Sequence, residues 1–180
     1  AALPSAGIFY LAFQKDDWLW WLSMILIAIP LFETSYWLCM IFVKHLLIGK
    51  IKPGIIPVNS LSYYRKWVID SLINMSRLIT LPLYTTLYIL PFLRMLGVKI
   101  GKRAELSVLS YFSPDLTEIG PESFFADGSI VGGLKFYKGY CQIAANKVGK
   151  RSFIGNSAVV PMGKNVGDNC LIGVLSSPPE

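Results

Sequence analysis

Charged residues are scarce in this sequence. Only 16% of its 180 residues are Asp, Glu, Lys or Arg, whereas ordinary soluble domains carry about a quarter. The shortage is concentrated at the start, where residues 1–43 contain no charge except Lys15, Asp16, Asp17 and Glu33. After residue 104 the composition is that of a soluble domain rich in Gly, Ser and Val. This division excludes a uniform soluble domain and predicts an apolar part followed by a water-exposed part.

Histidine and cysteine are also rare. His45 is the only histidine and is not expected to be catalytic, while Cys39, Cys141 and Cys170 are far apart with no CxxC spacing. Neither a zinc site nor a disulfide framework is indicated, and three free thiols fit a reducing cytoplasmic setting. The sequence has no glycine-rich nucleotide loop of the GxGxxG or Walker type. We therefore expect no directly bound metal or cofactor.

The apolar part contains a predicted membrane span. Residues 18–32 carry no charge, and a second apolar run follows at residues 36–43. Together they extend to Ile48, further than the about 20 residues that cross a bilayer. One tilted helix with Glu33 inside it and two shorter segments broken near Pro30 are both compatible with this pattern. Glu33 is either a functional intramembrane acid or part of a helix break at the interface.

The residues that flank this span predict its orientation. A tryptophan cluster at residues 18–21 is typical of an interfacial aromatic belt, and Lys44 and Lys50 mark the opposite, cytoplasmic interface. The net charge of +6 is concentrated between residues 44 and 103, where Asp70 alone opposes ten basic residues. Membrane lipid is the expected partner and nucleic acid is not, because these charges are interleaved with Leu, Ile and Tyr runs. We therefore expect a membrane location with the C-terminal part on the cytoplasmic side.

A turn and amphipathic helices are predicted after the span. Residues 52–57 include two prolines and a glycine, which indicates a rigid turn. Asn59 or Ser60 is a suitable cap for a helix that begins directly afterwards. Aromatic and aliphatic residues then recur at three- and four-residue steps, and Pro82 and Pro91 are expected to kink or divide the helix. Such helices would lie on the membrane surface or pack against the span.

The C-terminal part has a repeat of six residues. Glycine directly follows the repeated apolar residue in seven of ten cases, and a small residue stands four positions after it in eight. A period of six does not fit an α-helix, because residues spaced by six would be distributed around all sides of the helix and not along one face. The apolar positions are Ile100, Leu106, Ile119, Phe125, Val131, Val148, Ile154, Val160, Val166 and Ile172.

This pattern resembles the hexapeptide repeat of left-handed β-helix proteins. In those proteins three hexads make one triangular coil with the apolar residues inside, and stacked coils bury a continuous core. We therefore predict an α+β fold with transmembrane helical segments in residues 1–50, a turn and membrane-surface helices in 51–97, and a left-handed parallel β-helix in 98–180. The repeat is interrupted at residues 112–118 and 137–147, which are either binding loops or connections.

Several stretches go beyond the generic repeat. They are residues 64–70, 94–101, 104–107, 113–116, 123–127, 153–158 and 171–176. In this order they resemble the membrane-bound C-terminal region of nonribosomal-peptide-synthetase-like proteins of the ε-poly-L-lysine synthetase type. The resemblance implies a region that takes an acyl or aminoacyl group from the phosphopantetheine thioester of a carrier domain and passes it to an amine or related acceptor. Because the sequence opens without methionine and stops after an unfinished repeat, we expect a fragment of a longer chain.

The candidate catalytic residues follow from this resemblance. Hexapeptide acyltransferases often use a histidine as general base, and the repeat part contains none. A carboxylate would have to serve instead, and Glu105, Asp115 and Asp127 lie in the family-like stretches. Asn156 could donate a hydrogen bond to a thioester oxyanion. Each residue also has a structural interpretation, such as a turn at Asp127, and we take Glu105 and Asp127 as the stronger candidates.

Two other functions fit the same sequence. The first is a noncatalytic module that binds carrier domains near the membrane or mediates homo-oligomer formation, and the missing histidine favours it. The second is a sugar O-acyltransferase that uses acyl-coenzyme A. A fold alone does not separate these functions, because the same scaffold hosts several.

Overall fold

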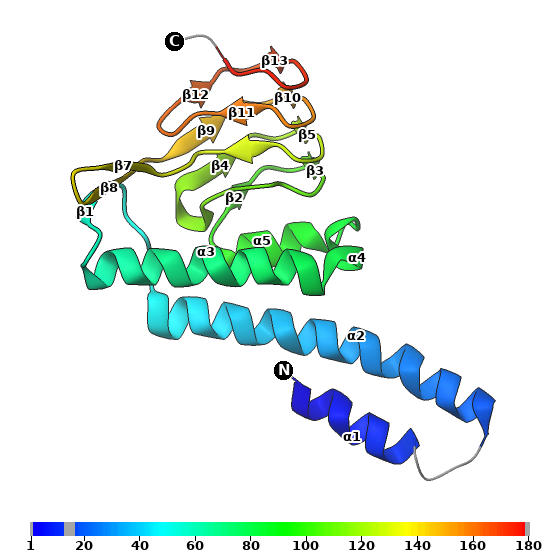
Figure 1. Ribbon diagram of the computed structural model, residues 1–180. Helices are drawn as coiled ribbons and strands as arrows, with labels where there is room; N and C mark the ends of the chain where they lie inside the picture. The colour runs from blue at the N-terminus through cyan, green and yellow to red at the C-terminus, as the bar shows by residue number, and fades with distance from the viewer. Residues whose placement is uncertain (1, 13–16, 179–180) are drawn as a thin grey trace.

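The chain combines a helical layer with a stack of short sheets (Figure 1), and the computed structural model describes residues 2–12 and 17–178. Helices α3, α4 and α5 lie beneath the sheets, and α2 with α1 lies on the other side of this layer. The helices are α1 (Ala2–Ala12), α2 (Trp18–Val43), the π-helix η1 (Lys44–Ile48), α3 (Leu61–Ile79), α4 (Leu81–Tyr84), α5 (Ile89–Leu96) and the 3₁₀ turn η2 (Pro114–Leu116). The strands are β1 (Gly54–Pro57), β2 (Lys99–Ile100), β3 (Glu105–Leu106), β4 (Thr117–Ile119), β5 (Phe124–Phe125), β6 (Ile130–Val131), β7 (Lys135–Tyr137), β8 (Tyr140–Ile143), β9 (Asn146–Val148), β10 (Phe153–Ile154), β11 (Val159–Val160), β12 (Asn165–Val166) and β13 (Leu171–Ile172).

Helix α2 continues into η1 as one helix from Trp18 to Ile48. It has 31 residues and is long and apolar enough to cross a membrane. Only 17% of its most apolar stretch is buried against the rest of the chain, so it is not a core helix. Asp17 caps its start by accepting a hydrogen bond from the backbone N–H of Leu19 at 3.0 Å. Because Pro30 lies inside α2 without ending it, the prediction of one continuous helix is confirmed and that of two broken segments is wrong.

Lys44, predicted to mark the cytoplasmic interface, points into the protein and not toward lipid. Its side chain is 2% exposed, and its Nζ lies 2.9 Å from Asp115 Oδ2 and donates to the carbonyl of Gly49 at 2.8 Å. The next residue, His45, has its Nε2 2.7 Å from the carbonyl oxygen of Met95. Since Asp115 and Met95 are distant along the chain, the local sequence could not reveal these two contacts.

Helix α3 is amphipathic, but its buried face includes the charged residue Lys66 beside Ile69 and Ile73. The N-cap of α3 is Ser60, whose hydroxyl accepts a hydrogen bond from the backbone N–H of Tyr63 at 3.2 Å. Ser60 was one of the two predicted caps. Tyr64, Trp67 and Leu78 are each more than half exposed, whereas Lys66 on the opposite face is fully buried. The helical region ends and restarts as α4 and α5, so the predicted division at the prolines is confirmed.

The segment predicted as a rigid turn is instead a strand. Gly54–Pro57 forms β1, which pairs antiparallel with β8, and β8 pairs in turn with β7. The β-branched Ile55 and Ile56 favour an extended backbone, and Pro57 is tolerated at the strand's end. The β7–β8 hairpin occupies part of the interruption at residues 137–147, where no strand was expected. It forms a separate three-stranded sheet beside the parallel sheets (Figure 1).

The remaining strands form three parallel sheets, which we call the sheet stack. Their orders are β12-β9-β4-β2, β13-β10-β5-β3 and β11-β6, and Tyr111 extends the third through a parallel bridge to Ile130. The chain visits the three sheets in turn and then starts the next layer, so that Lys99 pairs with Glu118, Glu118 with Lys147 and Lys147 with Asn165. The predicted inward residues of three of these layers lie on strands and are buried: Ile119, Phe125, Val131, Val148, Ile154, Val160, Val166 and Ile172.

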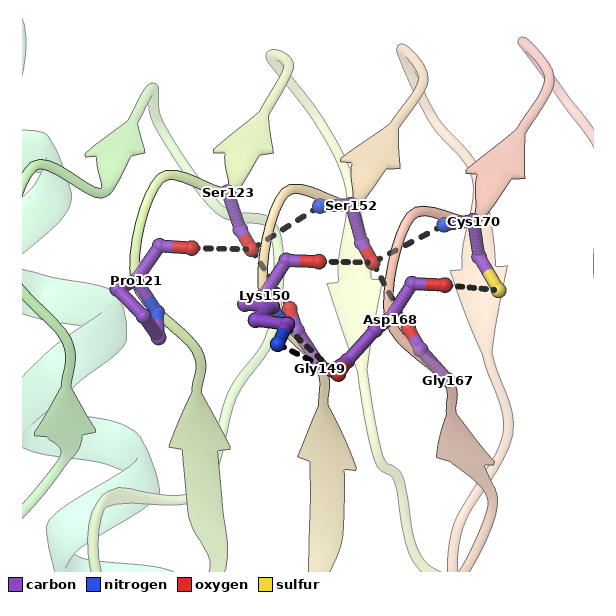
Figure 2. Close-up of polar contacts among 8 residues, drawn as sticks. All are labelled: Pro121, Ser123, Gly149, Lys150, Ser152, Gly167, Asp168 and Cys170. Atoms are coloured by element: carbon purple, nitrogen blue, oxygen red, sulfur yellow. Dashed lines mark hydrogen bonds and ion pairs between the residues drawn. The ribbon is translucent and has the colours of Figure 1, made fainter.

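One corner of the sheet stack explains why small residues recur there (Figure 2). The Ser123 hydroxyl donates to the carbonyl of Gly149 at 2.7 Å and accepts from the backbone N–H of Ser152 at 3.2 Å. Ser152 repeats this pattern one layer on, donating to Gly167 at 2.8 Å and accepting from Cys170 at 3.3 Å. These side chains satisfy buried backbone groups between layers, which a larger residue would push apart.

Candidate functional site

The sequence candidate Glu105 lies beside a surface groove. The groove encloses about 300 Å³ between the α4–α5 connection and the sheet of β3 and β5. Glu105 begins β3, is exposed, and pairs in register with Phe124 of β5. The groove is lined by Thr85, Thr86, Leu87, Ile89, Leu90, Glu105, Leu106, Ser107 and Phe124. A carboxylate at the edge of a largely apolar groove is a suitable general base for a substrate that enters it.

Hydroxyl groups provide the other polar atoms of this groove. Thr85 donates its hydroxyl proton to the carbonyl of Pro82 at 2.8 Å, and Thr86 donates to Leu83 at 2.7 Å. Their oxygens keep lone pairs that can accept hydrogen bonds from a ligand. The backbone of Ser107 is fixed by its N–H bond to the carbonyl of Phe125 at 2.9 Å. The groove therefore offers hydrogen-bond acceptors beside apolar side chains on both of its walls.

Asp127 and Asn156 occupy the same corner of two neighbouring layers. Phe125 of β5 pairs with Ile154 of β10, and Asp127 and Asn156 each follow one of these residues by two positions. The carbonyl of Asp127 accepts from the backbone N–H of Ser157 at 3.0 Å. Both side chains are exposed. The structure thus brings these two candidates together. They lie on the turns after β5 and β10, which belong to the same sheet as the strand β3 that begins with Glu105.

Asp115 lies elsewhere, at the junction between the long helix and the sheet stack. Its carboxylate is 8% exposed, forms the ion pair with Lys44, and accepts from the backbone N–H of Ile51 at 2.8 Å. Such a buried, doubly bonded carboxylate holds two segments together. The four candidates therefore do not converge on one point, and Asp115 is bound in a structural contact.

A second buried polar cluster was not predicted from the sequence. Lys66 is fully buried, and its Nζ lies 2.5 Å from Asp70 Oδ1 and 2.9 Å from the hydroxyl of Tyr111. The Tyr111 hydroxyl donates to Asp70 Oδ2 at 3.3 Å. Burial raises the pKa of the Asp70 carboxyl above its usual value, although Lys66 acts against that shift. Burial also raises the pKa of Tyr111, so its hydroxyl stays protonated as a donor.

The sequence held a partial signal for this cluster. Lys66 and Asp70 are four residues apart, which places them on one helix face, and both lie in the family-like stretch 64–70. Tyr111 belongs to the sheet stack, and nothing in the sequence linked it to α3. The three side chains join α3 to the stack, and they line none of five surface hollows found among the described residues. We therefore interpret the cluster as a connection between the two layers.

Metal binding finds no support in the part of the chain that the structure describes. Within residues 2–12 and 17–178, no group of three or more His, Cys, Asp or Glu side chains is placed to hold an ion. The three cysteines are unpaired thiols.

Comparison with known proteins relates the chain to poly-amino-acid synthetases. It is a distant homologue of one region of such an enzyme, the δ-poly-L-ornithine synthetase of Acinetobacter baumannii (strain AB307-0294). The two sequences are 35% identical over 137 residues, which is 76% of this chain and 10% of that protein. The chain thus spans about a tenth of the length of the curated relative it matches. No protein-family model and no solved structure matches it.

Proposed function

We propose that this chain is the membrane-attached part of a poly-amino-acid synthetase-like protein, of the nonribosomal-peptide-synthetase-like type. In this role it receives an acyl or aminoacyl group from the thioester of a carrier domain and passes it to an amine or related acceptor. The observation that carries the proposal is the homology to δ-poly-L-ornithine synthetase, whose name describes a polymer of an amino acid. The groove at Glu105 supplies a place for the transfer.

Two surfaces support attachment to a membrane. The helix Trp18–Ile48 exposes Leu26, Phe42 and Leu46, each more than half exposed, to its surroundings. Helix α3 exposes Trp67 and Leu78 while it buries Lys66, which is not the pattern of a helix that faces only water. Exposed apolar surface on two neighbouring helices marks a contact with lipid or protein. In the proposal this contact is lipid, and the sheet stack stands on the cytoplasmic side.

We interpret the sheet stack as a left-handed β-helix of hexapeptide repeats. Three parallel sheets visited in turn, with one inward apolar residue per strand, support this interpretation. Crossovers between parallel strands are right-handed in almost all folds, so a left-handed winding is itself a specific expectation. Proteins with this repeat include many acyltransferases, which is why the proposed reaction is acyl transfer.

In the proposed reaction the carrier's phosphopantetheine arm lies in the groove. The arm has two amides, and the Thr85 and Thr86 oxygens can accept from their N–H groups while Leu87 and Phe124 contact its apolar atoms. The groove thus fits such an arm in chemistry. The acceptor amine attacks the thioester carbonyl carbon, a C–N bond forms and the C–S bond breaks. Glu105 takes a proton from the attacking nitrogen, and that proton passes on to the departing thiolate.

Turnover of the intact parent protein tests this role. We expect Glu105→Gln to lower the rate of product formation at least about a hundredfold, the size of one general-base contribution. Glu122→Gln is the matched control, because Glu122 is an exposed carboxylate of the same stack that pairs with Arg103 at the surface. Amounts of loaded carrier must be equal in all variants. Equal rates for Glu105→Gln and the control would remove Glu105 from the mechanism.

We have a different expectation for Asp127 and Asn156. Neither side chain lines the groove at Glu105, so the roles of Asn156 as oxyanion donor and of Asp127 in orienting the acceptor amine form a separate hypothesis. Asp127→Asn and Asn156→Ala should then lower turnover without changing the amount of loaded carrier. If only Glu105→Gln affects the rate, the corner is a structural turn and not part of the site.

A noncatalytic carrier-binding module is the second candidate function. The specific observation in its favour is that Asp115 is engaged in a buried ion pair, while Asp127 and Asn156 do not line the groove at Glu105. This function predicts that the loaded carrier binds the chain with full affinity and that none of the three groove and corner variants changes turnover. The activity comparison above therefore separates the two.

A further inference from the structure

We propose that a basic hollow at the end of the long apolar helix binds the phosphate of an anionic phospholipid headgroup. The hollow encloses about 310 Å³ between the segment after η1, strand β1 and the first turn of α3. Its polar lining consists of Lys50, Lys52, Ser62 and Arg65. The inference rests on the proposed membrane attachment and adds a specific ligand to it.

The charge of the hollow is of one sign only. No Asp or Glu lines it, and among the described residues none of Lys50, Lys52 and Arg65 forms an ion pair. Lys44, a few residues earlier, shows the alternative, because Asp115 neutralises it inside the protein. Three like charges around one hollow repel one another, and an anion between them would convert that repulsion into attraction.

The start of α3 adds to this positive potential. The 19-residue helix begins at Leu61, and Ser62 of its first turn lines the hollow. The Ser60 cap satisfies only the backbone N–H of Tyr63, so other N–H groups of the first turn remain available to a ligand or water. A phosphate in the hollow would therefore meet side-chain cations and the positive end of a helix together.

Apolar surface next to the hollow identifies the phosphate as that of a lipid. Ile48, the last residue of the apolar helix, and Ile55 line the hollow beside the basic groups. Ile55 is 68% exposed, and Leu46 and Leu47 just before the hollow are 65% and 62% exposed. A soluble phosphate would leave these side chains in water, whereas the acyl chains of a phospholipid would cover them. Basic pockets at the cytoplasmic ends of membrane helices bind anionic headgroups in this way.

The test measures headgroup preference in the full chain reconstituted into phosphatidylcholine nanodiscs. A fluorescent phosphatidylglycerol is titrated into the discs, and its binding is compared for the natural chain, Lys52→Gln/Arg65→Gln and the control Lys102→Gln/Lys138→Gln. The control removes the same charge from exposed residues of the sheet stack and the β7–β8 turn. We expect the hollow variant to bind about thirtyfold more weakly, from about fivefold for each basic side chain near an anionic surface, and the control to bind as the natural chain does.

Each other outcome overturns the inference. Equal weakening in both double variants would mean general attraction to the net charge, and no preference for phosphatidylglycerol over phosphatidylcholine would mean no headgroup site. Displacement of the lipid by 4′-phosphopantetheine at similar concentrations would assign the hollow to a carrier arm instead. Flotation with phosphatidylcholine vesicles is read on the same preparation. A chain that floats without headgroup preference refutes this site alone, whereas a chain that does not float refutes the membrane attachment as well.

Discussion

Adding one methyl group at Gly120 should separate two layers of the sheet stack. A Cβ at this position would lie 2.5 Å from the carbonyl carbon of Gly149, 2.6 Å from the nitrogen of Lys150 and 2.7 Å from the oxygen of Gly149. Normal contacts between such atoms are about 3.5 Å or longer, so the next layer would have to move by about 1 Å. That shift would also lengthen the hydrogen bond from Gly120 N–H to the carbonyl of Val148, now 2.7 Å.

Gly167 is the matched control, because it has the same place in the last layer of the stack that the structure describes, where no further layer covers it. A Cβ there meets only Cys170 Sγ, at 3.5 Å, which is an ordinary contact. Overpacking typically costs about 1–3 kcal/mol, and we expect the upper end for Gly120→Ala because all its neighbours are backbone atoms. Gly167→Ala should change stability by less than about 0.5 kcal/mol.

Amide hydrogen exchange of strands β4 and β9 measures this difference within the full chain. A loss of about 3 kcal/mol in opening free energy corresponds to exchange faster by about a hundredfold. The strand amides should therefore exchange that much faster in Gly120→Ala and at the natural rate in Gly167→Ala. Equal exchange in the two variants would refute the close stacking of layers at this corner.

Three further predictions concern single side chains. Lys66→Met leaves the Asp70 carboxylate buried without its cation and should lower the free energy of unfolding by about 3 kcal/mol in a denaturant titration. The double variant Lys66→Met/Asp70→Asn should lose clearly less free energy of unfolding, because no charge is left unpaired. The backbone N–H of Lys150 holds the pKa of Asp168 below its usual value. The stability that this contact adds is therefore present above the unfolded pKa and is lost as the pH falls through the folded pKa. Asp168→Asn should be less stable than the natural chain at neutral pH and equally stable in strong acid. Burial raises the pKa of the Cys141 thiol. Maleimide should therefore label the partly exposed Cys170 before Cys141, and Cys141 only on unfolding. Equal labelling rates for these two cysteines would contradict the burial of Cys141.

The repeat region was the part of the fold most open to prediction from sequence. A period of six with glycine and small residues at fixed offsets is a local pattern, and it identified the strands and the buried face of Val148 and Ile154 correctly. The same local reasoning failed at β1, because Gly54 and Pro57 suggest a turn unless a partner strand is present. That partner, β8, lies in a segment that the repeat pattern could only mark as an interruption.

The functional residues were predictable as candidates but not as a site. Glu105 was selected for its residue type and surroundings in the sequence, and the groove beside it depends on the α4–α5 connection, which no repeat pattern places. Asp115 was a weaker candidate of the same residue type, and its contact with Lys44 makes it structural. The basic hollow was not predicted for the same reason, since Lys52 and Arg65 lie near each other only because β1 packs beside α3.

Disulfide trapping of the carrier's phosphopantetheine thiol in the intact parent protein tests the proposed function most directly. Cys39, Cys141 and Cys170 are first replaced, and a single cysteine is then placed in the groove by Ser107→Cys. Lys147→Cys, on the exposed face of another sheet, is the control. The account predicts rapid cross-linking to the groove cysteine and only background cross-linking to the control. Equal cross-linking at the two positions, or none at the groove, would contradict it.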